Sequence, residues 1–241
     1  MPAIEIKNLY KSFGTLQVLR GVSLKVAEGE FFGLFGANGA GKTTLLRVIT
    51  GQLSADSGEA YIAGIPCTNP MSIKRVVGIV PEAESPPTFL TTRETLELVC
   101  RIRRLEGMPD RIDKWLKFFD LNDKADVLCR DLSKGQKQKL ILASAFIHEP
   151  KLLLLDEAFI NLDPIYQRQL REYMKGVVEE GRTIFMCTHI LEIAEKVCTR
   201  VAVIDGGRIV AQGTIPELRM KEGEGLEEIF IRAVEGSNHE P

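Results

Sequence analysis

An apolar segment near the start of the chain runs directly into a glycine-rich turn and then into a helical pattern. Residues 31–44 read FFGLFGANGAGKTT, and residues 36–43 have the phosphate-binding spacing G-x-x-x-x-G-K-[ST]. Glycines at three positions of this stretch let successive backbone N–H groups turn inward around a phosphate. The segment therefore predicts a buried strand, a phosphate-binding loop and a helix, in that order.

Two side chains of this loop carry the chemistry that a nucleotide requires. Lys42 supplies a point charge for the β- and γ-phosphates, and Thr43 offers a hydroxyl to Mg²⁺. The helix that begins here adds its positive N-terminal end. We therefore expect a nucleotide with its magnesium ion at this loop.

A second informative segment is a run of four leucines, residues 152–155, followed by Asp156 and Glu157. Continuous apolarity is typical of a parallel strand that is covered on both faces. We expect the Asp156 carboxylate to lie near the Thr43 hydroxyl and to reach Mg²⁺. Two adjacent carboxylates repel each other, so the presence of the second one indicates a function of its own. We therefore predict that Glu157 polarises the attacking water.

Another continuous apolar run, residues 183–187, ends at Thr188 and His189. Polar groups at the ends of parallel strands mark the crevice where α/β folds bind ligands. At that place the imidazole of His189 can hydrogen-bond the γ-phosphate. We therefore include His189 in the predicted site.

Other periodicities predict the remaining elements. Alternating apolar residues indicate strands, and longer amphipathic stretches indicate helices. We expect strands near 4–6, 22–26, 61–65 and 76–80, helices at 92–106, 110–119, 134–148 and 226–231, and a hairpin of 201–204 with 208–211. Residues 81–87 are a proline-rich break, and we interpret Arg101, Arg103 and Arg104 as a solvated helix face.

Composition narrows the class of protein. A chain of 241 residues with 44% hydrophobic residues supports one large domain, or one domain with an inserted subdomain. A net charge of −2 argues against nucleic acid as the main partner. No apolar run reaches the length of a membrane span, and residues 1–11 contain no apolar signal region, so we expect a cytosolic protein. Five scattered cysteines indicate reduced core residues instead of disulfides or metal ligands.

The segment 132–136 reads LSKGQ and lies between the phosphate loop and the leucine strand. Ser133 opens a helix whose free N–H groups and dipole can face a phosphate, and Gly135 allows close approach. In this order of motifs the chain resembles the ATP-binding cassette (ABC) ATPases, whose signature is L-S-G-G-Q. The resemblance covers residues 4 to about 220.

The resemblance implies a fold and a domain organisation. The expected fold is an α/β P-loop NTPase with a RecA-like parallel core sheet, an antiparallel β subdomain and an inserted α-helical subdomain. The ABC ATPase domain would span residues 1–220, with the helical subdomain at about 84–150 and a short C-terminal extension at 221–241.

The resemblance also assigns roles across a dimer, in which one ATP is held between two chains. Phe13 falls at the aromatic position that stacks on adenine, and no N-K-x-D string is present, which favours ATP over GTP. The phosphates are expected to contact Gly36, Ala37, Asn38, Gly39, Ala40, Gly41, Lys42, Thr43 and Thr44. The residues expected to act on the nucleotide of the opposite chain are Ser133, Gly135, Gln136 and Asp163.

Two positions depart from the family pattern. Family members usually have a Gln after the strand that begins near residue 76, whereas this chain has Glu82. We hypothesise that Glu82 takes over this role as a ligand of Mg²⁺. Lys134 replaces the first glycine of the signature. Together with the C-terminal helix, these departures resemble the ATPase subunits of drug- and sodium-export-type ABC systems.

The resulting interpretation is an ATP-binding and hydrolysing subunit of an ABC transporter that uses ATP and Mg²⁺. Its expected partners are a transmembrane permease subunit and a second ATP-binding subunit, in a homodimer or a heterodimer, with no nucleic acid. Its expected place is the cytoplasmic face of the cell membrane. An alternative is an ABC-type ATPase without a membrane partner that acts as a mechanical switch on DNA or ribosomes. A third, a binding module that does not hydrolyse ATP, is disfavoured by Lys42, Asp156 and Glu157.

Overall fold

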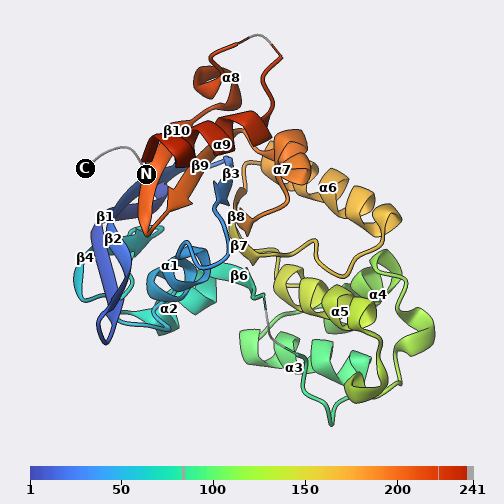
Figure 1. Cartoon of the computed structure of the whole chain (residues 1–241). Helices are drawn as coiled ribbons and strands as arrows, with labels where there is room; N and C mark the ends of the chain where they lie inside the picture. Colours follow the sequence, from blue (N-terminus) through green and yellow to red (C-terminus); the bar gives the residue numbers. More distant parts are fainter. Residues whose placement is uncertain (83–84, 222, 238–241) are drawn as a thin grey trace.

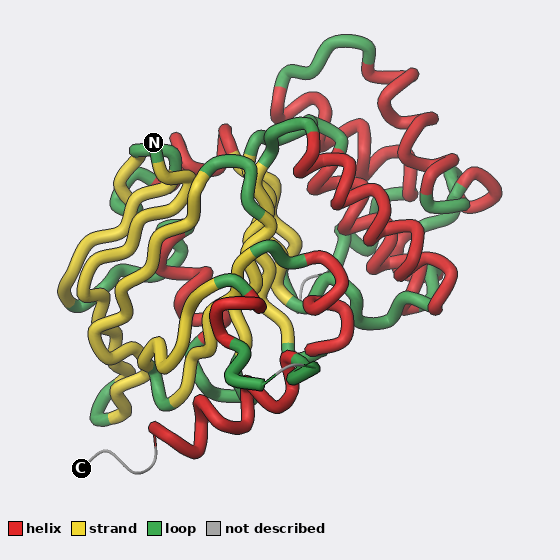
Figure 2. Tube along the Cα trace, turned by 90° about the horizontal axis from the view of Figure 1, so that it is seen from above, coloured by secondary structure: helices red, strands yellow, loops and turns green. Residues whose placement is uncertain are grey.

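The computed structural model describes residues 1–82, 85–221 and 223–237, and within these residues two sheets form the frame of the protein (Figures 1 and 2). The larger sheet has the strand order β10-β9-β3-β8-β7-β6. Its strands pair in parallel except at β10, which runs antiparallel to β9. The bounds are β3 (Phe31–Phe35), β6 (Val77–Val80), β7 (Leu152–Asp156), β8 (Thr183–Thr188), β9 (Arg200–Asp205) and β10 (Arg208–Gly213).

The central strands are buried on both faces, as their continuous apolar sequence predicts. All residues of β3, β7 and β8 are buried. Successive residues of a strand point to opposite faces, so Phe32 and Leu34 enter one core while Phe31 and Phe35 enter the other. The larger sheet therefore separates two hydrophobic cores.

The first core lies between the larger sheet and an antiparallel sheet with the order β2-β1-β4-β5. This sheet consists of β1 (Pro2–Phe13), β2 (Leu16–Ala27), β4 (Ser57–Ile62) and β5 (Ile65–Pro66). Helix α1 (Lys42–Ile49) packs into the same core, and α2 (Pro70–Val76) leads into β6. The strands of this smaller sheet pair antiparallel, which confirms the antiparallel β subdomain that the family resemblance implies.

Two of the predicted strand boundaries in this region are wrong. The strand expected at 61–65 is interrupted by a turn at Ala63 and Gly64, both of which have positive φ values. Val76 belongs to α2 and not to a strand, because the helix that Asn69 caps continues to this residue.

The second core is covered by helices. α3 (Thr92–Arg103), α4 (Met108–Phe118) and α5 (Lys134–Phe146) form a helical lobe, which stands to one side of the sheets in Figure 2. Trp115 is its centre, with four aromatic rings within 6 Å of its own. Short 3₁₀ turns at Asn122–Lys124 and Cys129–Asp131 connect α4 to α5. α3 ends earlier than predicted, since Arg104 takes a left-handed conformation.

The remaining helices follow β7 along the chain. They are α6 (Pro164–Glu179), α7 (Leu191–Val197), α8 (Ile215–Leu218) and α9 (Leu226–Ser237). α9 confirms the helix expected at 226–231 and extends it. The break expected at 81–87, the start of the helical subdomain at 84 and the extension at 221–241 each include residues outside the described ones. None of the described helices is both long enough and apolar enough to cross a bilayer.

Arg103 is not part of a solvated face, which corrects one expectation. Its guanidinium donates to the carbonyl oxygens of Lys74, at 3.0 Å, and Val77, at 3.2 Å. The Val77 oxygen also lies 3.1 Å from His148 Nε2. Arg103 and His148 therefore connect the helical lobe to the beginning of β6.

Candidate functional site

The carboxyl ends of four neighbouring strands bring the predicted residues together. In the order β3, β8, β7 and β6, these strands lead respectively into the phosphate loop, His189, Glu157 and Glu82. The register aligns their ends, because Phe35 pairs with Thr188 and Asp156 pairs with Cys187. Side chains distant in the sequence thus lie along one edge of the sheet, where α/β folds bind ligands.

The phosphate loop, residues 36–43, closes around the ammonium group of its own lysine. Lys42 is 7% exposed, and its Nζ donates to the carbonyl oxygens of Gly36 at 2.7 Å and Ala37 at 3.2 Å. Gly41, directly before α1, has φ 109°, a conformation that side chains rarely adopt. Glycine therefore allows the backbone of the loop to adopt its conformation, and the charge of Lys42 is held inside the loop.

Asp156 has a buried oxygen without a protein partner. It is 3% exposed, and no described residue hydrogen-bonds its Oδ1 atom. The pKa of the carboxyl is raised to about 6, first by burial and then by the charges of Glu82 and Glu157, while the nearby Thr43 hydroxyl lowers it. A buried, unpartnered carboxylate oxygen beside other anionic groups is stabilised by a cation.

The other oxygen atoms near Asp156 fit a hard divalent cation. The Thr43 hydroxyl donates to Glu82 Oε2 at 3.4 Å, so the side chain of Glu82 turns toward the phosphate loop. Hydroxyl and carboxylate oxygens are the ligands that Mg²⁺ prefers. The residues present at this position therefore fit a magnesium ion.

The carboxylate of Glu157 is fixed at both of its oxygens. Thr188 Oγ1 donates to Oε2 at 3.0 Å, and His189 Nδ1 lies 2.8 Å from Oε1. The backbone N–H of Glu157 donates to the Cys187 carbonyl at 2.9 Å, and its φ value is 52°. Because the side chain is only 5% exposed, these contacts decide where its negative charge lies.

The contact with Glu157 determines how the imidazole of His189 is oriented. An ionised carboxylate only accepts hydrogen bonds, so Nδ1 carries a proton. The ring is half exposed, and Nε2 remains available to a group in the crevice. The structure therefore brings His189 to the site and places it in contact with Glu157.

The segment 132–136 forms the N-terminal cap of α5. Ser133 Oγ accepts from the backbone N–H of Gln136 at 3.2 Å, and the Gln136 side chain accepts from the Ser133 N–H at 2.9 Å. This capping box uses both side chains within the chain. A methyl group at Gly135 would lie 2.9 Å from the Asn161 carbonyl oxygen, so glycine permits contact with the loop after Glu157.

The other predicted residues lie outside the strand-end cluster. Asp163 caps α6, accepting from the N–H groups of Ile165 and Tyr166 at 3.1 and 3.2 Å. Phe13, at the end of β1, is 49% exposed, with Lys11 Nζ 5.6 Å from its ring centre. Figure 1 shows α5 in the helical lobe, on the other side of β6 from α1. The chain thus carries the phosphate loop and the α5 cap on separate parts of its surface.

A groove of about 250 Å³ continues from the oxygen cluster between α1 and β6. Its walls include Thr43, Glu82 and Asp156 at one end, and Leu46 and Leu53 farther along. The cation position therefore opens toward the surface beside β6.

Two residues of this region had no predicted role. Thr188 holds the carboxylate of Glu157, and the Gln138 side chain donates to the Ala158 carbonyl at 3.1 Å. The position of Thr188 directly before His189 was the available signal for the first. The sequence gives a weaker signal for Gln138: it is a glutamine near the start of α5, and only the structure shows that it is buried and which group it contacts.

Comparison of the sequence with protein families gives one consistent result. The sequence model of the family described as "ABC transporter" matches residues 19–160. "Nod factor export ATP-binding protein I" of Rhizobium meliloti (strain 1021) is 37% identical over 99% of this chain and 71% of its own length. The protein of the same name from Paraburkholderia xenovorans is also 37% identical, over 95% of this chain and 76% of its own length.

Solved structures give the same result. An ATP-binding subunit of an ABC transporter superposes with a TM-score of 0.90 at 31% identity, covering 96% of this chain and 99% of that one. A dimeric, post-hydrolysis state of the ATP-binding cassette MJ0796, bound to ADP and Pi, superposes with a TM-score of 0.80 at 25% identity. That match covers 88% of this chain and 98% of the other.

Proposed function

The chain belongs to the ABC transporter family as an ATP-binding subunit and ATPase, and from this premise we propose how its own residues bind and hydrolyse ATP. The observation that carries the proposal is the convergence of Lys42, Asp156, Glu157 and His189 at adjacent strand ends. Positive charge, cation ligands and a carboxylate for water activation are the components that phosphoryl transfer requires.

The phosphate loop binds the β- and γ-phosphates of ATP. In this step the ammonium group of Lys42 exchanges its hydrogen bonds with Gly36 and Ala37 for contacts with phosphate oxygens. Loop amides from residues 36–44 and the N-terminus of α1 add further donors. The exposed ring of Phe13 provides a surface on which adenine stacks.

Thr43, Asp156 and Glu82 hold Mg²⁺ beside the phosphates. When bound, the ion would neutralise the negative charge that develops during phosphoryl transfer. The unpartnered Oδ1 of Asp156 and the orientation of Glu82 toward Thr43 support this assignment.

Glu157 orients and polarises the attacking water. Its carboxylate is fixed by Thr188 and His189, so the charge has a defined position before ATP arrives. His189 contributes Nε2 as a donor or acceptor to the γ-phosphate region. Positioning of this kind is the main contribution a protein makes to phosphoryl transfer.

The Glu157→Gln variant tests this function. Glutamine keeps the shape of the side chain but removes its charge and basicity, so we expect ATP turnover to fall at least a hundredfold. ATP affinity should remain within a few fold of the wild-type value, because Lys42 and the phosphate loop are untouched. Steady-state ATPase assays and equilibrium nucleotide binding measure the two quantities. Normal turnover by Glu157→Gln would contradict the assignment.

Each ATP is completed by a second chain. Ser133, Gly135 and Gln136 form the N-terminus of α5, where a helix attracts anions, and Asp163 lies on the adjoining loop. Because this cap and the phosphate loop occupy separate parts of one chain, the cap faces the phosphates of the partner chain. The dimeric state of MJ0796 supports this arrangement for a relative of the same family.

A transmembrane subunit docks on the surface beside the groove. Five large apolar side chains are at least 37% exposed on or near α2 and α3: Met71, Val76, Phe89, Leu98 and Ile102. Large apolar side chains that are exposed on two contacting helices, such as α2 and α3, are typical of a protein interface. We place this surface against the membrane partner, with the chain at the cytoplasmic face of the membrane. The names of its relatives favour export as the direction of transport.

A further inference from the structure

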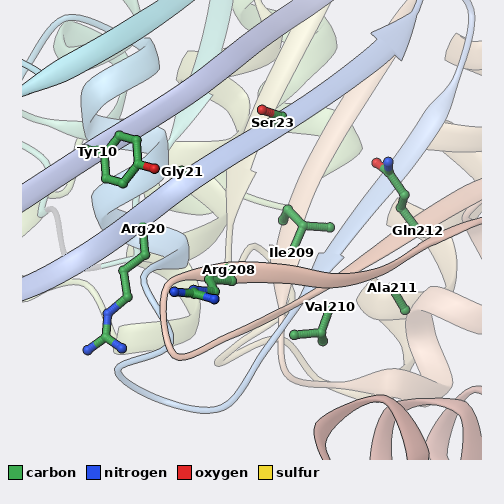
Figure 3. A pocket seen from close by; sticks show the side chains of 9 residues that line it. All are labelled: Tyr10, Arg20, Gly21, Ser23, Arg208, Ile209, Val210, Ala211 and Gln212. Carbon is green, nitrogen blue, oxygen red and sulfur yellow. The ribbon is translucent and has the colours of Figure 1, made fainter. Parts of the chain in front are cut away.

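A second hollow, which shares no lining residue with the phosphate loop or the oxygen cluster, lies between the edges of the two sheets (Figure 3). It is shallow and open to solvent, and it has a volume of about 560 Å³. Strand β2 ends the order of the antiparallel sheet, and β10 ends the order of the larger sheet. Edge strands present backbone N–H and C=O groups that their own sheet does not pair. The walls of the hollow are therefore polar even before side chains are considered.

One backbone contact determines where the two sheet edges meet. The N–H of Arg20 on β2 donates to the carbonyl of Gly207, directly before β10, at 2.8 Å. A methyl group on Gly207 would lie only 2.3 Å from the Val18 carbonyl oxygen, so this close approach requires glycine. The contact brings Arg20 and Arg208, the neighbour of Gly207, to the same end of the hollow, as Figure 3 shows.

The charged residues that line the hollow are both positive. They are Arg20 and Arg208, and no acidic residue lines it. Within the described ranges, neither arginine forms an ion pair, and the one side-chain hydrogen bond of Arg20 goes to the Gln17 carbonyl at 3.3 Å. Asp205, which is opposite Arg208 in the hairpin register, is not part of the lining. Because the lining contains two guanidinium groups and no carboxylate, the surface of the hollow is positive at this end.

Neutral hydrogen-bonding groups complete the lining. Tyr10 is opposite Arg20 in the register of β1 and β2, and Gln212 lies farther along β10. Among the described residues, neither the Tyr10 hydroxyl nor the Gln212 amide has a hydrogen-bond partner within the protein. Figure 3 shows Gln212 at the end of the hollow opposite the two arginines. The hollow thus has a cationic end and a neutral polar end.

We propose that this hollow binds a small phosphate-bearing solute, with the phosphate at Arg20 and Arg208. Guanidinium groups are planar donors that match phosphate oxygens, and two of them can hold one phosphate from two directions. The volume exceeds that of a single phosphate, so the remainder of the solute lies toward Gln212 and the strand edges. This site has no residue in common with the phosphate loop or with the oxygen cluster around Asp156.

Titration with inorganic pyrophosphate in calorimetry tests the proposal. Pyrophosphate also binds the phosphate loop, so the titration is repeated with Lys42→Ala, in which only the hollow should retain binding. The double variant Arg20→Gln with Arg208→Gln should bind pyrophosphate at the hollow at least tenfold more weakly. Unchanged ATP affinity of this double variant shows that it is folded. A matched control, Lys151→Gln with Arg168→Gln, removes two exposed cations elsewhere and should bind pyrophosphate like the wild type.

A second measurement identifies the source of the phosphate. Sedimentation with phosphatidylglycerol vesicles, compared with phosphatidylcholine vesicles, detects a lipid headgroup at the arginines. Binding of pyrophosphate without arginine-dependent sedimentation indicates a soluble ligand. If Lys42→Ala binds neither pyrophosphate nor the anionic vesicles, the proposal is wrong. An equal loss of binding in the matched control would also overturn it, because the effect would then be one of general charge.

Discussion

At the scale of single residues, the hydroxyl of Thr188 is a positioning group for the Glu157 carboxylate. It donates to Oε2 of Glu157 at 3.0 Å and accepts from the Ile190 N–H at 3.1 Å. Thr188 is 2% exposed, so water does not replace the hydroxyl when it is removed. Its hydrogen bond thus fixes the Glu157 carboxylate relative to the backbone of β8, and we propose that this carboxylate orients the attacking water.

We therefore expect Thr188→Val to lower kcat for ATP hydrolysis roughly tenfold, the equivalent of one hydrogen bond of about 1.4 kcal/mol. The KM for ATP should change little, because the phosphate loop is intact. Thr188→Ser restores the hydroxyl and should recover most of kcat. Steady-state kinetics of both variants test this role. Equal impairment of the serine and valine variants would contradict this role, because restoring the hydroxyl alone would then not restore kcat.

Glu82 gives a second prediction at this scale. Its carboxylate, 3.4 Å from the Thr43 hydroxyl, would contribute a charge to the metal site that glutamine in other family members does not. We expect Glu82→Gln to raise the Mg²⁺ concentration for half-maximal ATPase activity several-fold, and Glu82→Ala to raise it roughly tenfold. Activity is measured against free Mg²⁺ at saturating ATP. Glu179→Gln, at an exposed carboxylate on α6, is the matched control. Wild-type Mg²⁺ dependence in both Glu82 variants would exclude it as a ligand.

At the scale of elements, the junction of α3, β6 and the end of α5 depends on one backbone oxygen. The Val77 carbonyl accepts from Arg103 and from His148 Nε2. The pKa of His148 is lowered to about 4, first by burial and then by the charges of Arg103 and Arg111, although the Val77 oxygen opposes this. Its buried Nδ1 atom has no partner among the described residues. A second proton on this ring would therefore be buried beside two cations.

This junction predicts how stability changes with pH. An unfolded histidine takes up its proton near pH 6.5 and the folded one only near pH 4, so between these values the unfolded state binds more protons. The free energy of unfolding should therefore fall as the pH decreases from 6.5 to 4, by up to about 3 kcal/mol from this residue. Urea unfolding of wild type and His148→Gln across this range measures the effect. The carboxylates are common to both proteins, so parallel pH profiles would contradict the prediction.

The elements also show what the sequence could and could not predict. The leucine run at 152–155 and the apolar run at 183–187 predicted buried parallel strands, since a strand covered on both faces requires apolar residues at successive positions. The split of 61–65 was missed, because Ala63 with φ 49° is not a residue type that indicates a turn. The partial burial of Arg103 was missed because its acceptors, the carbonyls of Lys74 and Val77, belong to other elements. Backbone acceptors have no signature in the sequence.

The same limit applies to the site. Lys42, Asp156 and His189 were predictable because strand ends and glycine spacing determine their place. Thr188 and Gln138 were not, because their roles depend on distances of about 3 Å between side chains and loops. Motifs therefore locate the groups that we propose to take part in the reaction, whereas the groups that position them require the structure.

At the scale of the whole molecule, the segments expected to contact ATP are distributed between the two hydrophobic cores. The phosphate loop and α1 pack into the core between the sheets, while α5 with its capping box belongs to the core beneath the helical lobe. The larger sheet separates the two. A dimer in which each lobe faces the phosphate loop of the other chain would unite these parts. ATP would then serve as part of the interface, and dimerisation would depend on it.

The last prediction follows from this division. With Glu157→Gln to prevent turnover, ATP should convert monomers to dimers, which size-exclusion chromatography with light scattering detects. Adding Ser133→Glu introduces a carboxylate at the α5 cap, where it would repel the phosphates held by the partner chain. We expect this change to abolish the ATP-dependent dimer but to leave ATP binding to the monomer intact, since the phosphate loop lies elsewhere. Ser54→Glu, at an exposed serine, adds the same charge and should permit dimerisation. A full yield of dimer with Ser133→Glu would mean that the cap does not face the bound nucleotide.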